Sequence, residues 1–285
     1  MLSQISLPLQ SGSSIRLQGD YHGTAADFCE LSRLLSGTWG APEACPHCRT
    51  VEVIPAAAVT VYESRRVRIA CDVTAKVYYH AVKDHNLLTD PEFGVFVWHG
   101  VVLAAASAAL LRGENVLLLH GAMLERDGEA LLLCGESGVG KSTTSCRWQA
   151  CGNRAFSDDM ILLEFIDGEV LAHRLPTWSA CRAGGTAGKS YPFAPPLRVK
   201  NLLALGRSDD GEKIIPLPEA DFLAQLYHCV CFHYEPMLKK LPEAERYAAA
   251  ETMYRSFLKL AKIFPPQALL AALDGNLTET LRGFL

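Results

Sequence analysis

The stretch Gly135-Glu-Ser-Gly-Val-Gly-Lys-Ser142 decides the fold of this chain. It matches the pattern G-x-x-x-x-G-K-[S/T], in which a glycine-rich loop holds phosphate groups. The apolar run Ala130–Cys134 comes directly before it and is typical of a strand; Thr143–Cys151 comes after it and has the composition of a helix that ends at Gly152. This order is the context that the pattern requires, so the sequence predicts a phosphate-binding loop in an α/β domain.

The residue types in this loop suit a nucleotide with magnesium. Glycines carry no β-carbon, so backbone N–H groups can approach phosphate oxygens closely. The pattern predicts that Lys141 reaches the β- and γ-phosphates and that the hydroxyl of Ser142 binds Mg²⁺, at the positive end of the following helix. The residues that we expect to contact the nucleotide are consecutive: Gly135, Glu136, Ser137, Gly138, Val139, Gly140, Lys141, Ser142 and Thr143.

Composition excludes several other classes of protein. The chain has 285 residues, is 49% hydrophobic and carries a net charge of −4, which predicts a soluble globular protein with ample core. A weakly acidic chain without Lys/Arg runs gives no electrostatic footprint for nucleic acid or for an anionic membrane surface. The first residues lack the basic and apolar regions of a signal peptide, so we expect a cytoplasmic protein.

One apolar segment could be mistaken for a membrane span. Val95–Leu111 is almost free of charge, but it is short, rich in alanine and interrupted by His99-Gly100. We therefore predict a buried core helix there.

The ten cysteines favour free thiols in a reducing compartment, because several lie in apparent core segments: Cys71, Cys134, Cys146 and Cys229. A metal site is a weaker alternative. Cys45-Pro-His-Cys48 has the spacing of half a zinc site, and Cys229 and Cys231 within His228–His233 could supply the other half.

Residues 1–90 are predicted to form an α+β region, and residues 91–285 the phosphate-loop domain. Ser14–Gln18 and Arg66–Cys71 alternate as half-buried strands do, and Ala25–Leu35 is typical of a helix.

Around the phosphate loop the sequence predicts two hairpins. Val116–His120 and Ala122–Glu125 continue as strand towards a turn at Arg126–Glu129 and the strand that feeds the loop, and a second strand pair spans Met160–Phe165 and Glu169–Leu175. Hairpins around a phosphate loop depart from a plain alternation of strands and helices.

The rest of the sequence predicts three more secondary-structure elements. Val199–Leu205 is typical of a strand, Ala220–Cys231 of a helix or strand, and Ala244–Phe264 of an amphipathic helix that ends at Pro265-Pro266. We expect the apolar residues at helical spacing in the last helix to pack in the core, in preference to forming an acceptor-peptide groove: Tyr247, Met253, Tyr254, Phe257, Leu258 and Ala261.

Four motif elements together carry a resemblance to a known family. His120-Gly121, Gly140-Lys-Ser142, Gly152 and Ser157-Asp-Asp159 resemble, at matching spacings, the catalytic domain of bacterial HPr serine kinase/phosphorylase. The resemblance covers roughly residues 115–165 and implies an HPr-kinase/PEP-carboxykinase-like P-loop fold. Within that group the chain is most similar to the ScmC type of the SynChlorMet cassette, which is encoded beside peptide-modifying radical enzymes.

The resemblance implies roles that suit phosphoryl transfer, which needs positioning, charge neutralisation and a group that accepts the proton of the attacking hydroxyl. It implies ATP and Mg²⁺ as cofactors, Lys141 and His120 in the active site, Asp159 as the base, and Asp158 with Ser142 at the metal. The two aspartates could also exchange roles. A core histidine at position 120 and a solvated turn or helix cap at the aspartates are the alternatives.

The match also departs from the family pattern. The similar kinases carry a metal-binding glutamate in a glycine-containing signature, and no such signature follows Leu175. Pro176–Ser190 ends like a phosphate loop, but the prolines in Tyr191–Pro196 prevent the helix that such a loop needs. Two readings stay open for this segment: a loop over the active site in which Arg182 or Lys189 contacts phosphate or acceptor, and a plain surface loop.

Taken together, these features predict an ATP- and Mg²⁺-dependent kinase for a Ser or Thr hydroxyl of a small protein or precursor peptide. A kinase of a small-molecule hydroxyl is one alternative. A nucleotide-dependent binding module that acts with a peptide-modifying enzyme is another. Similar kinases assemble as homo-oligomers, and neither that assembly nor the reverse phosphorylase reaction can be derived from these residues.

Overall fold

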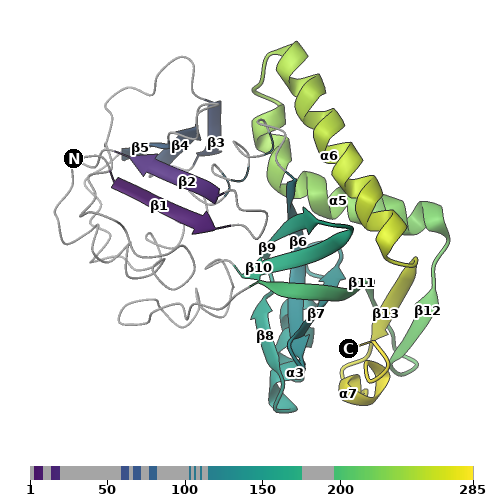
Figure 1. Cartoon of the computed structure of the whole chain (residues 1–285). Coiled ribbons are helices and arrows are strands. Elements are labelled where there is room, and N and C mark those ends of the chain that lie inside the picture. The colour runs from purple at the N-terminus through teal and green to yellow at the C-terminus, as the bar shows by residue number, and fades with distance from the viewer. Residues whose placement is uncertain are drawn as a thin grey trace. The chain divides into compact units, whose positions relative to one another are not determined.

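The computed structural model describes residues 3–8, 14–19, 59–63, 67–71, 77–81, 103, 106, 110, 115–174 and 196–284 (Figure 1). Contacts divide the chain into two units. The first comprises Met1–Glu114, Cys181–Ala194 and Tyr234–Thr252; the second comprises Asn115–Ala180, Pro195–His233 and Met253–Leu285. The boundary that we predict near residue 90 lies outside the described residues and stays a prediction.

The described strands of the first unit form two small antiparallel sheets. β1 (Ser3–Pro8) pairs with β2 (Ser14–Gly19), and β4 (Val67–Cys71) pairs with both β3 (Val59–Glu63) and β5 (Val77–Ala81). The predicted strands at residues 14–18 and 66–71 are confirmed, and the predicted helix at residues 25–35 falls outside the described residues.

Three described positions test the apolar segment before the phosphate-loop domain. Leu103, Ala106 and Leu110 are helical and at most 5% exposed, as expected for one face of a buried helix. Among the helices that the structure describes, none is both long and apolar enough to cross a membrane.

The second unit is built on an eight-stranded mixed sheet. Its main path runs β10-β9-β6-β7-β11-β13-β12, β8 pairs with β6, and β10 also pairs with the start of β11. The strands are β6 (Val116–Arg126), β7 (Glu129–Cys134), β8 (Arg154–Ser157), β9 (Met160–Ile166), β10 (Glu169–Arg174), β11 (Leu197–Arg207), β12 (Lys213–Pro216) and β13 (Gln267–Ala271).

Asp-Gly pairs make both predicted hairpins. Asp127 and Gly128 have φ values of 54° and 85° between β6 and β7, and Asp167 and Gly168 have 49° and 83° between β9 and β10. Positive φ at both central residues is the conformation that joins two twisted strands through a two-residue turn. The local sequence therefore fixes the register of both strand pairs.

The strand that leads into the glycine loop lies within the parallel part of the sheet. β7 and β13 both run parallel to β11, so the carboxyl ends of these three strands lie at one edge. Helix α3 (Lys141–Ala150) starts directly after the loop at this edge. The predicted strand at 199–205 and the predicted helix after the loop are confirmed.

Three further helices complete the described chain: α5 (Glu219–Leu238), α6 (Glu243–Ile263) and the short α7 (Leu277–Thr280). The segment Ala220–Cys231, predicted as a helix or a strand, is helical and belongs to α5. α6 confirms the predicted amphipathic helix. The expectation that its apolar residues all pack in the core is wrong for two of them. Met253 and Phe257 are buried, but Tyr247 and Tyr254 are 65% and 50% exposed.

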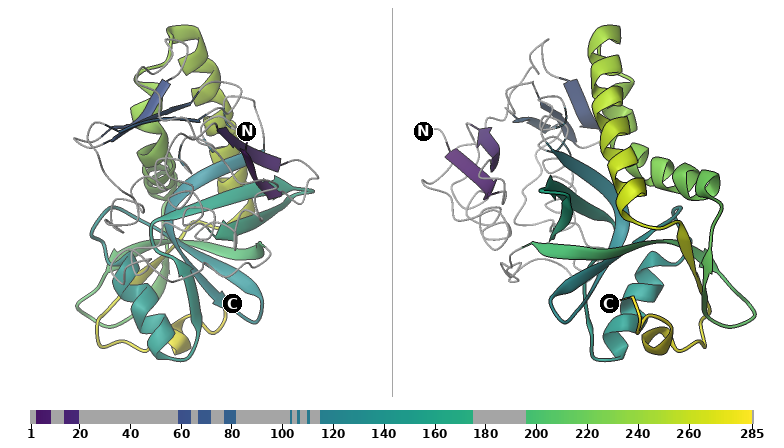
Figure 2. Two further views of the ribbon diagram at one scale, coloured as in Figure 1. Left: turned by 90° about the vertical axis from the view of Figure 1, so that its left-hand side faces the viewer. Right: turned by 45° about the vertical axis from the view of Figure 1, so that its right-hand side comes forward.

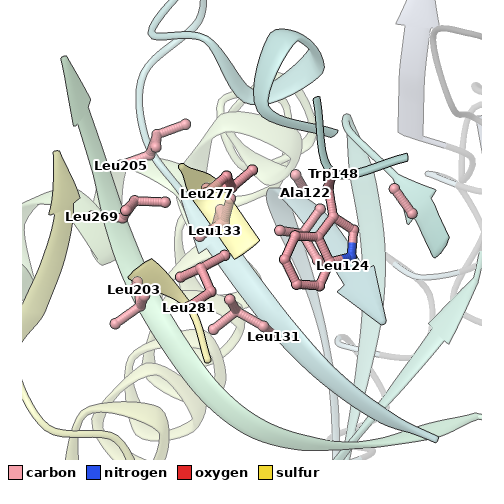
Figure 3. Close-up of a cluster of buried hydrophobic side chains, with 11 residues drawn as sticks. Ala122, Leu124, Leu131, Leu133, Trp148, Leu203, Leu205, Leu269, Leu277 and Leu281 are labelled. Atoms are coloured by element: carbon pink, nitrogen blue, oxygen red, sulfur yellow. The ribbon is translucent and has the colours of Figure 1, made fainter. Parts of the chain in front are cut away.

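The core of the second unit lies between the sheet and the pair of helices α3 and α7, which Figure 2 shows beside each other. Figure 3 shows the side chains from both layers meeting there. Trp148 of α3 is fully buried, and its indole Nε1 donates a hydrogen bond of 3.2 Å to the carbonyl of Glu125. The other members are Ala122, Leu124, Leu131, Leu133, Ala155, Leu203, Leu205, Leu269, Leu277 and Leu281. This packing fixes α3, and hence the loop before it, against the sheet.

Candidate active site

The glycine loop has the backbone of a phosphate cradle. Gly138 and Gly140 have φ values of 81° and 121°, which favour glycine strongly. Gly140 is the N-cap residue of α3, and its carbonyl accepts the backbone N–H of Thr144 at 2.8 Å. The first turn of α3 therefore directs its remaining N–H groups towards the loop, as anion binding requires.

Lys141 is held inside this loop. The residue is 6% exposed, and Nζ donates to the carbonyl oxygens of Gly135 at 2.8 Å and Glu136 at 3.0 Å. An ammonium group has three donors, so these two contacts leave one for a phosphate oxygen. Burial lowers the pKa of Lys141 from its ordinary value of 10.5, against the opposing charges of nearby acidic groups.

The two predicted aspartates follow β8 and lie in the same electrostatic environment. Asp158 is 5% exposed and the side chain of Asp159 is 14% exposed, and both carboxylates favour the charged form of Lys141. The alternative of a solvated turn does not describe Asp158, which is buried, and Asp159 is only partly exposed. Both carboxylates thus lie near enough to Lys141 for their charges to act on its ammonium group.

His120 joins this group from β6. Its Nε2 lies 3.9 Å from Oδ1 of Asp159, and its ring stacks on Phe232 of α5 with centroids 4.3 Å apart. The ring of His233 approaches it edge-on at 5.5 Å. His120 lies within β6, which continues through it to Arg126; the strand exchanges its pairing with β9 for pairing with β7 at Gly121.

Gly121 shows why a glycine follows the histidine. A β-carbon there would lie 2.9 Å from the carbonyl oxygen of Leu133, a backbone atom that cannot move alone. The backbone N–H of Gly121 also donates to the carbonyl of Asp159 at 3.2 Å. This close approach holds the aspartate beside His120.

Two buried cysteines interact electrostatically with the lysine. Cys134 ends β7 and Cys229 lies on α5, and both are fully buried. A hydrogen bond from the Cys134 thiol, and secondarily the charge of Lys141, lower the pKa of Cys229. Free buried thiols are confirmed for this pair, but Cys146 is exposed, because it lies on the outer face of α3.

The predicted Mg²⁺ ligands are an exposed hydroxyl and a buried carboxylate, and their role stays a prediction. Ser142 lies in the first turn of α3 and is exposed, and together with the buried carboxylate of Asp158 it offers the oxygen donors that Mg²⁺ prefers. In the described ranges, no three His, Cys, Asp or Glu residues are grouped closely enough to hold a metal by themselves. Cys45 and Cys48 lie outside those ranges, as do Arg182 and Lys189 of the predicted loop.

Sequence reasoning missed four contributors to the site. Cys229, Phe232 and His233 share one face of α5 at spacings of three and four residues, a signal that becomes readable once the segment is known to be helical. Arg207, at the end of β11, donates through Nε to the carbonyl of Val139 at 3.2 Å and through its second amino group to the carbonyl of Gly138. No local sequence pattern predicts these contacts of Arg207.

Part of the chain is similar in sequence to curated proteins. HPr kinase/phosphorylase from Clostridium beijerinckii is 38% identical to the chain over 53 residues, which is 19% of this chain and 18% of that protein. The corresponding protein of Clostridium perfringens is also 38% identical over 53 residues. The chain thus spans less than a fifth of the curated relatives it matches.

A solved structure and a family model complete the comparison. The Hpr(Ser) kinase/phosphatase from Coxiella burnetii is 16% identical, with a TM-score of 0.24, over 35% of this chain and 69% of that one. The family model of the SynChlorMet cassette protein ScmC matches residues 101–285. That match covers more than half of the chain and includes the phosphate loop, His120 and both aspartates, so the chain belongs to the family of the SynChlorMet cassette protein ScmC.

Proposed function

We propose that this protein is an ATP- and Mg²⁺-dependent phosphotransferase that phosphorylates a Ser or Thr hydroxyl of a small protein or precursor peptide. The observation that carries the proposal is the convergence of the lysine and the two carboxylates, with Nε2 of His120 3.9 Å from Asp159. A phosphate loop alone could only bind nucleotide. The His120–Asp159 pair, whose carboxylate interacts electrostatically with the lysine, adds the group that a hydroxyl acceptor needs.

Lys141 and the loop backbone supply charge neutralisation. The lysine is anchored by the carbonyls of Gly135 and Glu136, so its remaining N–H donor has a fixed direction when phosphate arrives. Negative charge develops on the equatorial oxygens of the transferred phosphoryl group, where a pre-positioned ammonium and backbone N–H groups stabilise it.

Asp159 is the proposed base. The acceptor O–H bond breaks as its oxygen attacks the γ-phosphorus, the proton passes to a carboxylate oxygen of Asp159, and the bond from the γ-phosphorus to the bridging oxygen breaks to release ADP. Nε2 of His120 lies 3.9 Å from Oδ1 of that carboxylate and favours its orientation. Because Gly121 holds the Asp159 backbone, the carboxylate does not need to be ordered at the moment of reaction.

Ser142 and Asp158 are the proposed holders of Mg²⁺. A hydroxyl and a carboxylate are hard oxygen ligands, and the phosphates of a bound nucleotide would complete the set. The ion, when bound, would neutralise charge on the β- and γ-phosphates.

The acceptor class comes from the relatives. The matched proteins are named kinases of HPr, and membership of the ScmC family favours a protein or peptide acceptor over a metabolite. Action in the cytoplasm and homo-oligomeric assembly belong to the same proposal and rest on the same likeness.

Mass spectrometry of the purified protein with ATP, Mg²⁺ and candidate acceptors tests the proposal. Short peptides encoded beside the gene should be included with free serine and threonine as small-molecule competitors. We expect one phosphate to be added to a Ser or Thr of a protein or peptide, and expect no addition with Lys141→Ala or Asp159→Asn.

The two variants separate binding from chemistry. Asp159→Asn should still bind ATP, because the carboxylate does not belong to the phosphate loop, whereas Lys141→Ala should lose both binding and transfer. Phosphate on free serine in place of a peptide would support the small-molecule kinase. Bound ATP with no phosphorylated product, and association with a partner only when ATP is present, would support the binding module.

A further inference from the structure

A cavity of about 380 Å³ opens beside the phosphate loop, on the side away from the aspartates' strand β8 in the order of the sheet. It is lined by Val139, Gly140 and Thr143 of the loop and the start of α3, and also by Asp209 and Leu273. The volume falls within the range of about 300–1,000 Å³ that is usual for small-molecule pockets. The mechanism above gives this cavity no role.

The position of the cavity within the sheet indicates what it could hold. Ser208 and Asp209 follow β11 directly, and Ala272 and Leu273 follow β13, so the cavity lies at the carboxyl ends of two strands parallel to β7. Ligands of open α/β sheets bind outside the carboxyl ends of the parallel strands. A nucleotide whose phosphates occupy the loop after β7 would extend its remaining part over the neighbouring strand ends.

The walls are held in place by contacts that do not depend on a ligand. Arg147 donates to both carboxylate oxygens of Glu212 at 2.9 and 3.2 Å and to the carbonyl of Gly275 at 2.7 Å. Arg207 bridges from the end of β11 to the carbonyls of Gly138 and Val139. The loop and the cavity are therefore parts of one preformed site.

The lining is chemically mixed, as a nucleoside requires. Val139, Ala272 and Leu273 offer apolar surface on which a base can lie, and Leu273 is 83% exposed at the rim. Asp209 offers a carboxylate that can accept hydrogen bonds, and Ser208 a hydroxyl.

We propose that this cavity binds the nucleoside part of the nucleotide, with the Asp209 carboxylate accepting a hydrogen bond from a nucleoside O–H or N–H group. The proposal rests on the proposed phosphotransferase function, because it needs phosphates in the adjacent loop. It assigns base and sugar recognition to strand ends about 70 residues and more beyond the loop, which the loop motif itself cannot provide.

Isothermal titration of the full chain with Mg²⁺ and two probes, ATP and inorganic tripolyphosphate, tests the assignment. The wild-type protein should bind ATP about tenfold or more tightly than tripolyphosphate, and Asp209→Ala should reduce that preference by about tenfold through loss of a charged hydrogen bond. Its matched control is Asp210→Ala, which makes the same charge change at the next exposed residue, outside the cavity lining, and should leave the preference unchanged.

The outcomes distinguish this inference from the proposed function. Equal affinity of the wild-type protein for ATP and tripolyphosphate, or equal effects of the two aspartate variants, would overturn the nucleoside assignment while leaving the phosphate loop intact. Failure of both probes to bind would overturn the proposed function itself. Titration with 2′-deoxy-ATP and with GTP then shows which group Asp209 contacts. Weaker binding of 2′-deoxy-ATP alone identifies the ribose, and weaker binding of GTP alone identifies the base.

Discussion

Nε2 of His120 lies 3.9 Å from Oδ1 of Asp159, and the residue after the histidine donates its backbone N–H to the carbonyl of the same aspartate. The side-chain distance is longer than a hydrogen bond but short enough for attraction when the imidazole is protonated. Phe232 covers one face of the ring. The histidine can therefore orient the carboxylate without consuming its capacity to accept a proton.

Replacing His120 with Gln should lower kcat by roughly a hundredfold, because a misplaced base loses its alignment with the acceptor hydroxyl. The KM for ATP should change little, since the histidine is not part of the phosphate loop. Steady-state phosphorylation kinetics measure both constants. His228→Gln, a change at an exposed histidine of α5, is the matched control, and an unchanged kcat in His120→Gln would remove the positioning role.

The lowered pKa of Lys141 gives a pH dependence with a defined sign. The free protein loses this charge at a lower pH than an exposed lysine does, so ATP affinity should fall as pH rises through the lowered pKa, below 10.5. ATP titrations at increasing pH measure the fall. In Lys141→Arg the guanidinium stays charged, so whatever affinity remains should not show this decline.

The same shift affects folding in the opposite direction. The unfolded chain holds the Lys141 proton to a higher pH than the folded chain, so this group adds stability as pH rises from the lowered pKa towards 10.5. Burying the charged ammonium group of Lys141 is unfavourable, and deprotonation removes that cost.

Gly121 should tolerate no side chain. Gly121→Ala places a methyl group 2.9 Å from the carbonyl oxygen of Leu133, so β6 and β7 must separate, with an expected loss of about 1–3 kcal/mol in the free energy of unfolding. Urea unfolding measures it. Gly283→Ala is the control, because no atom lies within 4 Å of a β-carbon there. Equal stability of the two variants would contradict the close approach of the strands.

Local patterns predicted the parts of the fold that local interactions determine. Asp127-Gly128 and Asp167-Gly168 set two hairpins, and Gly135–Ser142 sets the turn between β7 and α3. Strands β8, β12 and β13 carry no such signal: each is only four or five residues long and takes its place by pairing with strands distant in sequence. Pairing of that kind depends on the whole sheet.

The candidate site divides in the same way. Lys141, Asp158 and Asp159 could be predicted because spacing along the chain carries their likeness to a family. Phe232 and Arg207 could not, since they reach the site only through tertiary packing of α5 and the end of β11. The exchange of pairing partners after His120 could not be predicted either, because it changes nothing in the hydrophobic periodicity of β6.

The core that supports α3 gives the last prediction. Leu131 is fully buried in the cluster between the sheet and α3, so Leu131→Ala should lower the free energy of unfolding by about 2–5 kcal/mol through lost burial and the cavity that remains. Leu273→Ala makes the same chemical change at a side chain that is 83% exposed and should stay within about 0.5 kcal/mol of the wild type. Chemical denaturation measures both. If the loop is positioned by this core, ATP affinity of the folded Leu131→Ala protein should also fall, because α3 and the first turn that faces the phosphates lose their support. An unchanged affinity would show that the loop holds its conformation through its own backbone and the Arg207 contacts.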